Sequence, residues 1–317
     1  MRALVTGGAG FIGSHLVDAL LARGDDVVVL DNLATGRLDN LPAGVRVIEG
    51  DVTDPDTVAG AVAGCEVVFH QAALGSVARS VANPLASDEA NVRGTLAVLD
   101  AAHRAGVRRV VLASSSSVYG GASQVPTPET APLVPRSPYA VTKLAGEHYA
   151  RVFWELHGLE TVCLRYFNVF GPRQRHDSPY AAVIPLFVDA LLRGTPPQVH
   201  GDGRQSRDFT FVADAVAANL RAAEAPADRC AGRAYNIARG RPASLLELLD
   251  VLAGELGVSV TPVHTDPRPG DVRHSHADIS AARRDLGYAP AVTFREGLAR
   301  TLAWFRERAQ ATQEKIS

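Results

Sequence analysis

The sequence predicts an α/β protein, in which a doubly wound parallel sheet is joined to a smaller mixed α/β lobe. Two observations predict this class. Short apolar strands alternate with helical stretches through the first half of the chain, and a glycine-rich turn follows the first strand directly. Helices that connect parallel strands cover both faces of the sheet, so this rhythm is typical of such an architecture. A chain of 317 residues also exceeds the size at which one hydrophobic core usually stops growing, which favours two lobes.

The elements follow in chain order. Apolar runs predict strands at 1–6, 26–30, 45–49, 67–70, 109–113 and 161–165. Helical periodicity predicts helices at 14–23, 55–63, 84–105, 138–157 and 181–193. After residue 167 the chain becomes rich in proline and glycine loops, while 234–238 has the pattern of a strand that returns to the first sheet. We therefore expect a first domain at 1–167 with about 208–239 returning to it, and a second lobe at 168–207 and 240–317.

The turn after the first strand carries three glycines, Gly7, Gly10 and Gly13. Missing side chains permit a tight turn and a close approach of the backbone to a pyrophosphate, which the amino terminus of the next helix then faces. The alternative is a plain strand-to-helix turn. Asp31 ends the second strand eighteen residues beyond Gly13, a spacing that brings a carboxylate to the ribose 2′-hydroxyl. This favours NAD over NADP. Arg37 lies nearby in the sequence and would favour NADP instead.

Lysine is rare in this chain. Its two lysines, Lys143 and Lys315, stand among 32 basic residues, and Lys143 lies four positions after Tyr139. On a helix these positions share a face, so the ammonium is expected to stabilise the tyrosinate and make Tyr139 a general base near neutral pH. The alternative is an exposed helical pair of no chemical importance.

Composition limits the possible classes. A formal net charge of −2 gives no broad basic surface for nucleic acid, and no apolar run is long enough for a bilayer. The first strand begins almost at residue 1, which leaves no room for a signal peptide, so a cytoplasmic location is expected.

Cysteine and histidine usage argues against disulfides and metals. Cys65, Cys163 and Cys230 are odd in number and widely spaced, as expected for reduced thiols in the core. His274 and His276 form a His-x-His pair, but no cysteine or acidic cluster accompanies it, so no metal is expected.

Small and polar residues follow three of the predicted strands, at 51–52, 71–73 and 114–117. Because the carboxyl ends of parallel strands meet at one edge of a sheet, where ligands bind, these segments are expected to line a cofactor site.

Together these patterns resemble a known family, the extended short-chain dehydrogenase/reductases, and within it the UDP-sugar 4-epimerases related to UDP-glucose 4-epimerase. The resemblance covers almost the whole chain. It is carried by the segments 6–13, 31–33, 51–52, 70–73, 91–95 and 114–117, the pair at 139 and 143, and the segments 165–172 and 205–209. It implies a Rossmann-type fold, the cofactor NAD, a UDP-sugar substrate and a homodimer formed through helices around 91–105 and 139–157.

The resemblance also assigns residues. It places the NAD contacts on Gly7, Gly10, Phe11, Ile12, Gly13, Asp31, Asn32, Asp51, Val52, Gln71, Ala72, Ala73, Asn91, Ser114, Tyr139, Lys143 and Phe167. It gives catalytic roles to Ser115, Tyr139 and Lys143. It places the nucleotide part of the substrate on Asn168, Gln198, Val199, His200, Arg207, Arg268 and Asp271. The implied reaction oxidises C4 of the sugar to a 4-keto intermediate, which turns over in the pocket and is reduced on its other face.

Departures from the family pattern reduce the number of reactions that this chain is expected to catalyse. Ser116 and Ser117 stand where nucleotide-sugar 4,6-dehydratases place an Asp-Glu pair, and two hydroxyls are far weaker proton carriers at neutral pH. Dehydration is therefore disfavoured. Decarboxylases of the family usually keep a glutamate where Ser117 stands here. A dehydrogenase or reductase that consumes NAD, and a member that binds nucleotide without turnover, stay open as alternatives.

Two positions bear on the sugar. Ser275 occupies a place where the family varies between a bulky aromatic and a small residue, so a roomy pocket is expected. Arg175, together with Ser116 and Ser117, could hold a C6 carboxylate through charge-assisted hydrogen bonds. The hypothesis is a UDP-glucuronate 4-epimerase, with UDP-N-acetylglucosamine or UDP-glucose as alternative substrates. The opposing interpretation makes Arg175 a solvated loop residue and Ser275 small for reasons of backbone crowding.

Overall fold

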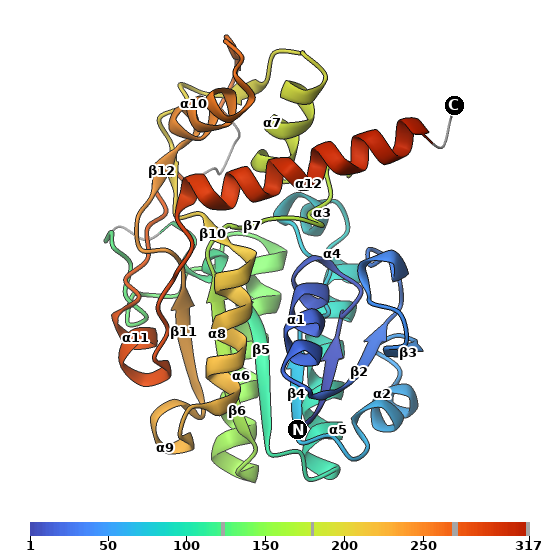
Figure 1. The fold of residues 1–317 in the computed structure, drawn as a ribbon. Coiled ribbons are helices and arrows are strands. Elements are labelled where there is room, and N and C mark those ends of the chain that lie inside the picture. The colour runs from blue at the N-terminus through green and yellow to red at the C-terminus, as the bar shows by residue number, and fades with distance from the viewer. Residues whose placement is uncertain (122–123, 179–180, 268–271, 315–317) are drawn as a thin grey trace.

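Seven parallel strands form the central sheet of the computed structural model, which describes residues 1–121, 124–178, 181–267 and 272–314 (Figure 1). The order across the sheet is β11-β6-β5-β4-β1-β2-β3. The strands are β1 (Arg2–Thr6), β2 (Asp26–Asp31), β3 (Arg46–Glu49), β4 (Val67–His70), β5 (Arg109–Ser115), β6 (Glu160–Tyr166) and β11 (Arg233–Ile237). The predicted fold class is confirmed, and each strand lies within two residues of its predicted position.

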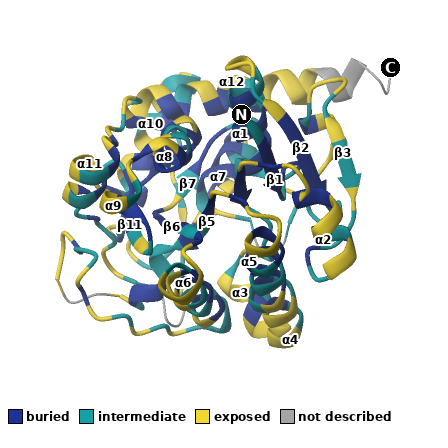
Figure 2. Cartoon of the chain, turned by 90° about the horizontal axis from the view of Figure 1, so that it is seen from below, coloured by how far each residue is buried: buried dark blue, intermediate teal, exposed yellow. Residues whose placement is uncertain are grey.

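Helices cover both faces of the sheet, and alternate strand residues pack on opposite sides. Val5 and Val29 face a core with α1 (Phe11–Ala22) and α8 (Val212–Glu224). Leu4 and Val28 face the core on the other side, with α2 (Pro55–Val62), α5 (Gly94–Arg104) and α6 (Pro138–His157). Burial on both faces explains why the strands are continuous apolar runs. Figure 2 shows the buried strands between the two helical layers.

The sheet has its topological switch between β1 and β4. The chain builds outward from β1 through β2 to β3, then crosses to β4 and builds in the opposite direction. Connections therefore leave the carboxyl ends of β1 and β4 toward opposite faces, which opens a crevice there.

A second lobe lies beyond this edge of the sheet (Figure 1). Its core joins α7 (Val183–Leu192), α10 (Leu245–Leu256) and α12 (Phe294–Glu314) around Val199 of β8 (Gln198–His200). Three short strand pairs complete it: β7 (Val169–Phe170) with β10 (Thr210–Phe211), β8 with β13 (Val263–Thr265), and β9 (Ser206–Arg207) with β12 (Ala243–Ser244). The chain passes from β10 directly into α8, so the lobe and the sheet share a continuous connection. We propose the division at 168–207 and 240–317 for this lobe.

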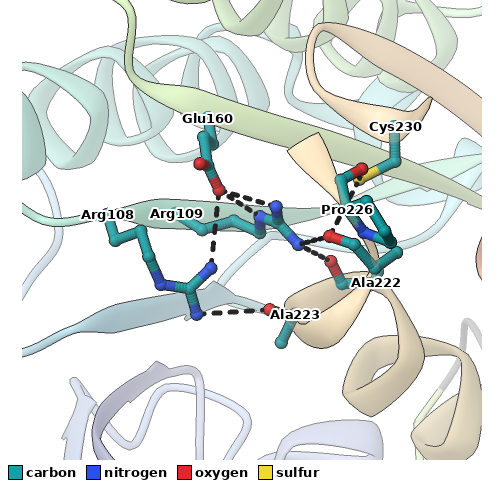
Figure 3. Close-up of polar contacts among 8 residues, drawn as sticks. Arg108, Arg109, Glu160, Ala222, Ala223, Pro226 and Cys230 are labelled. Carbon is teal, nitrogen blue, oxygen red and sulfur yellow. Dashed lines mark hydrogen bonds and ion pairs between the residues drawn. The ribbon is translucent and has the colours of Figure 1, made fainter. Parts of the chain in front are cut away.

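A buried arginine fixes the carboxyl end of α8 to the sheet (Figure 3). Arg109, which is 2% exposed, donates to the carbonyls of Ala222 and Ala225 at 2.8 and 2.6 Å and pairs with Glu160 at 2.6 Å. These carbonyls lie at or just beyond the last turn of the helix, where no amide of the helix is available to them. The guanidinium therefore caps α8 and joins it to β5 and β6.

Two of the predicted helices differ from the structure, and because no helix was predicted after 181–193, α8, α10 and α12 were missed. The first begins at Phe11 instead of residue 14, so Gly13 lies inside the helix, where a Cβ would lie 2.2 Å from the Gly7 carbonyl oxygen. The helix predicted at 84–105 is three pieces: α4 (Pro84–Asp88), a π-helical turn (Glu89–Arg93) and α5. A short helix α3 (Val77–Ala82) precedes them and was not predicted.

Two further helices complete the chain, α9 (Ala227–Cys230) and α11 (Ser280–Leu286). Within the residues that the structure describes, no helix has both the length and the apolar character that crossing a membrane requires.

Candidate active site

Three cavities meet at the carboxyl edge of the sheet. The first, which we call the sheet cleft, has a volume of about 510 Å³ and lies over the ends of the strands. Most of the predicted cofactor residues line it, namely Gly7, Gly10, Phe11, Ile12, Gly13, Asp31, Asn32, Asp51, Val52, Gln71, Ala72, Ala73, Ser114, Tyr139 and Lys143. Asn91 and Phe167 are buried and are not among the described residues that line it.

The glycine turn has the form of an anion site. Gly7 has φ +66°, and a Cβ there would lie 2.7 Å from the backbone of Ala72. Gly10 is the N-cap of α1, and it provides no side chain to bond the first amides of the helix. These amides and the helix dipole therefore face the sheet cleft, where a pyrophosphate group of NAD fits.

Asp31 defines the ribose end of the sheet cleft. Its carboxylate accepts from the amides of Ala9 and Leu33 at 2.9 and 2.8 Å, while its burial raises the pKa. A negative charge at the end of β2 opposes a 2′-phosphate. Arg37, the residue that could have reversed this preference, donates to Asp177 at 2.9 Å. The structure thus agrees with NAD in preference to NADP.

Tyr139 stands in the first turn of α6. Ser137 caps this helix by accepting from the amide of Ala140, and Pro138 occupies its first turn, where a missing N–H costs nothing. Ser115 is the last residue of β5 and hydrogen-bonds the phenol of Tyr139, which lowers the pKa of the phenol, although burial has the larger effect and raises it. Strand end and helix start thus bring the hydroxyl and the phenol together.

Lys143 lies on the same face of α6 but does not do what the sequence predicted. Its ammonium donates to the carbonyl oxygen of Ala113 at 2.9 Å and is 5.9 Å from the centroid of the Tyr139 ring. The pKa of Tyr139 is raised by burial, and Ser115 is the group that lowers it. The expectation that the ammonium lowers the phenol pKa is therefore wrong, because the side chain extends to β5. Burial lowers the pKa of Lys143 itself to about 8.

A second cavity, the lobe cleft, has a volume of about 690 Å³ and contains the predicted nucleotide residues Asn168, Gln198, His200 and Arg207. Its walls include Phe170, Leu186, Phe187, Phe209 and Leu245. Val199 points into the core of the second lobe and is fully buried. Apolar walls with a few polar groups and one arginine suit a planar base that carries phosphates.

A third cavity, the bridging cleft, connects the other two. Its volume is about 640 Å³, and it shares Phe11 and Gly75 with the sheet cleft and Gln174 with the lobe cleft. Arg175 lines the bridging cleft and donates to Asp177 at 2.8 and 3.2 Å. A ligand that spans all three cavities would pass this ion pair.

Other predicted substrate residues are not brought into these cavities. Ser116 and Ser117 form a 3₁₀ turn after β5, and the Ser117 Oγ is buried with no hydrogen-bond partner among the described residues. The amide of Ser275 donates to the Ser206 carbonyl, beside Arg207. Arg268 and Asp271 lie outside the described residues.

Sequence reasoning missed Tyr166, which lines the sheet cleft from the end of β6. Its hydroxyl donates to Gln71 at 3.3 Å and accepts from Asn219 at 2.7 Å, and Gln71 donates to Asn219 at 3.0 Å, so the three close a ring. The same search for polar residues at strand ends would have found it.

The histidine pair and the cysteines take structural positions. His274 bonds Ser206 Oγ at 2.9 Å, and His276 bonds the Gly240 carbonyl at 3.2 Å. Cys65, Cys163 and Cys230 are buried free thiols. In the described part of the chain, no three histidine, cysteine or acidic residues gather into a metal-binding group.

The sequence was compared with family models and with known proteins. The model of the NAD dependent epimerase/dehydratase family matches residues 3–238. A UDP-glucose 4-epimerase of Mycolicibacterium smegmatis is 43% identical over 318 residues, which cover 98% of this chain and 100% of that protein.

Two solved structures are also similar. The UDP-glucose 4-epimerase of Thermotoga maritima, solved with UDP-glucose, matches with a TM-score of 0.93 and 38% identity over 98% of this chain and 100% of that one. A variant of a UDP-glucuronic acid 4-epimerase from Bacillus cereus, solved with UDP-4-deoxy-4-fluoro-glucuronic acid and NAD, matches with a TM-score of 0.90 and 32% identity over 97% and 100%.

Proposed function

The chain belongs to the NAD-dependent epimerase/dehydratase family, and from this premise we propose that it is a UDP-sugar 4-epimerase that inverts C4 through a 4-keto intermediate. We propose UDP-glucuronate and UDP-galacturonate as its substrate pair. One observation carries the reaction: Tyr139 lines the sheet cleft in hydrogen-bond contact with Ser115, while the bridging cleft leads from there to the lobe cleft. A nucleotide held in the lobe cleft can thus extend its sugar toward the phenol.

Each residue has a distinct role in this reaction. Tyr139 takes the proton from the C4 hydroxyl, and Ser115 donates a hydrogen bond to the oxygen that becomes the ketone. Lys143 holds the end of β5 through the Ala113 carbonyl, which fixes Ser115 relative to α6. NAD bound in the sheet cleft would supply hydride transfer from and to C4, and its positive charge would favour ionisation of the phenol.

Inversion requires the intermediate to present its other face before it is reduced. The nucleotide is the natural pivot, because the lobe cleft holds polar and apolar groups suited to a base and its phosphates. Asn168, which lies between β6 and β7, and Arg207 of β9 line this cleft and would hold the pyrophosphate while the sugar turns. Anchoring at the nucleotide leaves the sugar free to rotate.

Arg175 supports the choice of a uronate. The arginine lines the bridging cleft. A guanidinium is a suitable partner for a C6 carboxylate. The similar Bacillus cereus protein was solved with a glucuronic acid derivative.

A neutral sugar is the second candidate. The ion pair of Arg175 with Asp177 favours it, because a guanidinium that is already neutralised attracts a carboxylate less strongly. UDP-glucose and UDP-N-acetylglucosamine are then the substrates to compare.

The test is to measure kcat/KM of the purified protein for UDP-glucuronate, UDP-glucose and UDP-N-acetylglucosamine, with no NAD added. We expect the uronate to be turned over best. Removal of a hydrogen bond to a charged group costs about 1.5–3 kcal/mol, so Arg175→Met should lower kcat/KM for the uronate by roughly 10- to 150-fold and leave the neutral sugars within about twofold.

Arg193→Met is the matched control, because Arg193 forms a similar exposed pair with Asp189 outside the three cavities. It should change none of these rates. Equal or better turnover of a neutral sugar by the wild-type enzyme would reject the uronate, and no inversion of any of the three sugars would reject the epimerase.

We also propose that the enzyme is a homodimer formed through the helical layer of α5 and α6. Val141, Val152 and Leu156 are exposed along one side of α6. Apolar side chains in such a row on a helix surface are typical of a helix–helix interface.

A further inference from the structure

His70 ends β4 in a fully enclosed position between two threonines. Its Nδ1 lies 2.7 Å from the hydroxyl of Thr6, the last residue of β1, and its Nε2 lies 3.0 Å from the hydroxyl of Thr95 in α5. All three side chains are buried. The imidazole thus connects the strand that leads into the glycine turn with the helix layer on one face of the sheet.

The neighbouring hydrogen bonds determine which nitrogen of His70 donates and which accepts. The Thr95 hydroxyl donates to the carbonyl of Asn91 at 2.5 Å, so its oxygen must accept from Nε2–H of His70. The neutral ring then accepts at Nδ1 from the hydroxyl of Thr6, which itself accepts from the amide of Ala72 at 3.3 Å. Burial lowers the pKa of His70 to about 3, which agrees with a neutral ring.

The chain of hydrogen bonds continues to the start of α6. The side-chain amide of Asn91 donates to the Thr142 hydroxyl at 3.1 Å, and that hydroxyl donates to the carbonyl of Tyr139 at 2.8 Å. Asn91 also accepts from the amide of Leu74 at 2.8 Å. One path therefore runs from Ala72, against which Gly7 packs, through His70 to the backbone of the residue that acts as the base.

Asn91 can serve both ends of this path because it lies in the π-helical turn 89–93. Such a turn interrupts the regular i→i−4 ladder and frees backbone groups, which side chains must then satisfy. Thr95 satisfies the Asn91 carbonyl and is in turn held by His70. The imidazole therefore stabilises an irregular turn that would otherwise return to an ordinary helix or open.

A satisfied histidine in a core is the ordinary alternative, and it predicts only a loss of stability on substitution. Two features distinguish His70. The ring uses both nitrogens, each toward a hydroxyl that passes the bond on, and the two ends of the path are the glycine turn of the sheet cleft and the first turn of the catalytic helix.

We propose that His70 is a positioning residue whose imidazole couples the glycine turn that receives the cofactor to the first turn of α6 that carries Tyr139. The catalytic part of this proposal rests on the proposed function, whereas the coupling itself does not. A change at Thr6 is then transmitted to Asn91 and Tyr139 without contact between Thr6 and either residue.

A double-mutant cycle tests the coupling. Thr6→Val and Thr95→Val each break one of the two bonds of His70, and the cycle is repeated in a His70→Phe background, which keeps a ring but removes both bonds. The first readout is amide hydrogen exchange of the peptide that covers 89–95 and of the amides of Ala72 and Leu74 in the protein without substrate. The second readout is kcat and KM for the best UDP-sugar.

We expect either threonine variant to raise exchange at both ends of the path and to lower kcat about fivefold, with KM changed less than about twofold, since one hydrogen bond contributes roughly 1 kcal/mol. The second substitution should add little to the first. In the His70→Phe background the two substitutions should become additive, because the ring no longer joins them and each loses only its second bond, to Ala72 or to Asn91. His70→Gln, which keeps a donor and an acceptor, should recover part of kcat.

Thr161→Val is the matched control, because Thr161 is also buried and its hydroxyl donates to the Ala150 carbonyl of the same helix α6 at 2.7 Å, outside the path. Its effects should add to those of Thr6→Val. Additive effects of Thr6→Val and Thr95→Val would overturn the proposal, and so would exchange that rises only near each substituted residue.

If His70→Phe does not fold, the cycle of the two threonines alone decides between coupling and independence. Coupled exchange in a protein that inverts no UDP-sugar would support the coupling and reject the proposed function. Full epimerase activity with additive threonine effects would support the proposed function and reject the coupling.

Discussion

At the residue scale, the geometry of the site is set by the hydrogen-bond partners of its buried polar groups. Sequence spacing correctly put Tyr139 and Lys143 on one face of a helix, because that relation is local. It could not show that the ammonium reaches the carbonyl of Ala113, since that strand is thirty residues away in the chain. The proximity of the polar residues at strand ends was predictable although they are distant in the chain, because parallel strands end at the same edge of a sheet.

Substitution of Lys143 should separate stability from activity. Its folded pKa is lowered from 10.5 to about 8, so below pH 8 the fold holds an ammonium in a poorly solvated place. Between pH 8 and 10.5 the unfolded chain binds more protons than the folded one, and the free energy of unfolding contributed by this group rises with pH. Lys143→Met should therefore be more stable than wild type at pH 7, by about 1 kcal/mol, and lose this advantage toward pH 10.

The same variant should lower kcat by at least about 100-fold, since it frees the end of β5 that carries Ser115. Urea unfolding at pH 7 and at pH 9.5 measures the stability difference. Lys143→Arg is the comparison: a guanidinium cannot shed its proton, so it should be less stable than Lys143→Met at both pH values. A Lys143→Met protein that is less stable than wild type at pH 7 would contradict the prediction that the buried ammonium destabilises the fold.

At the element scale, the strands of the central sheet were predictable and the irregular turns were not. The strands have continuous apolar patterns because both faces of the sheet are covered, so each could be located from the sequence. The π-helical turn 89–93 carries no such pattern. It is stabilised by the side chains of Asn91, Thr95 and His70, which come together only in the folded chain.

The clamp at the end of α8 makes a specific stability prediction (Figure 3). Glu160→Gln should lower the free energy of unfolding by about 3 kcal/mol, because it leaves the buried guanidinium of Arg109 without its counter-charge. Arg108→Met is the control. Arg108 meets the same carboxylate at 3.4 Å but is 48% exposed, so its loss should cost less than about 1 kcal/mol. Urea unfolding measures both, and equal losses would contradict the assignment of Arg109 as the cap.

At the scale of the whole molecule, the sequence predicted the sheet and the family, and both are confirmed. The second lobe was harder to predict. Its helices α10 and α12 were not located, because its short strands and loops give no repeated rhythm. The lobe cleft is formed by segments from 168 to 245 together with Val77 of α3, which the fold alone brings together.

Oligomeric state is the prediction that belongs to this scale. Light scattering should give a mass near twice the 33.5 kDa of one chain. Leu156→Glu should shift the protein toward the monomer, because Leu156 is 73% exposed in the apolar row of α6. Val258→Glu, at an exposed apolar residue after α10, should leave the mass unchanged. A monomeric wild-type protein would contradict the dimer.

The most direct test of the proposed reaction follows the hydrogen at C4. A UDP-sugar that the protein inverts is supplied with deuterium at C4, in buffered H₂O with no added NAD, to wild-type protein and to Tyr139→Phe. The reaction through a 4-keto intermediate predicts that the inverted product keeps its deuterium at C4, and that Tyr139→Phe lowers the rate by at least about 100-fold. Replacement of the deuterium by solvent hydrogen, or an unchanged rate in Tyr139→Phe, would contradict it.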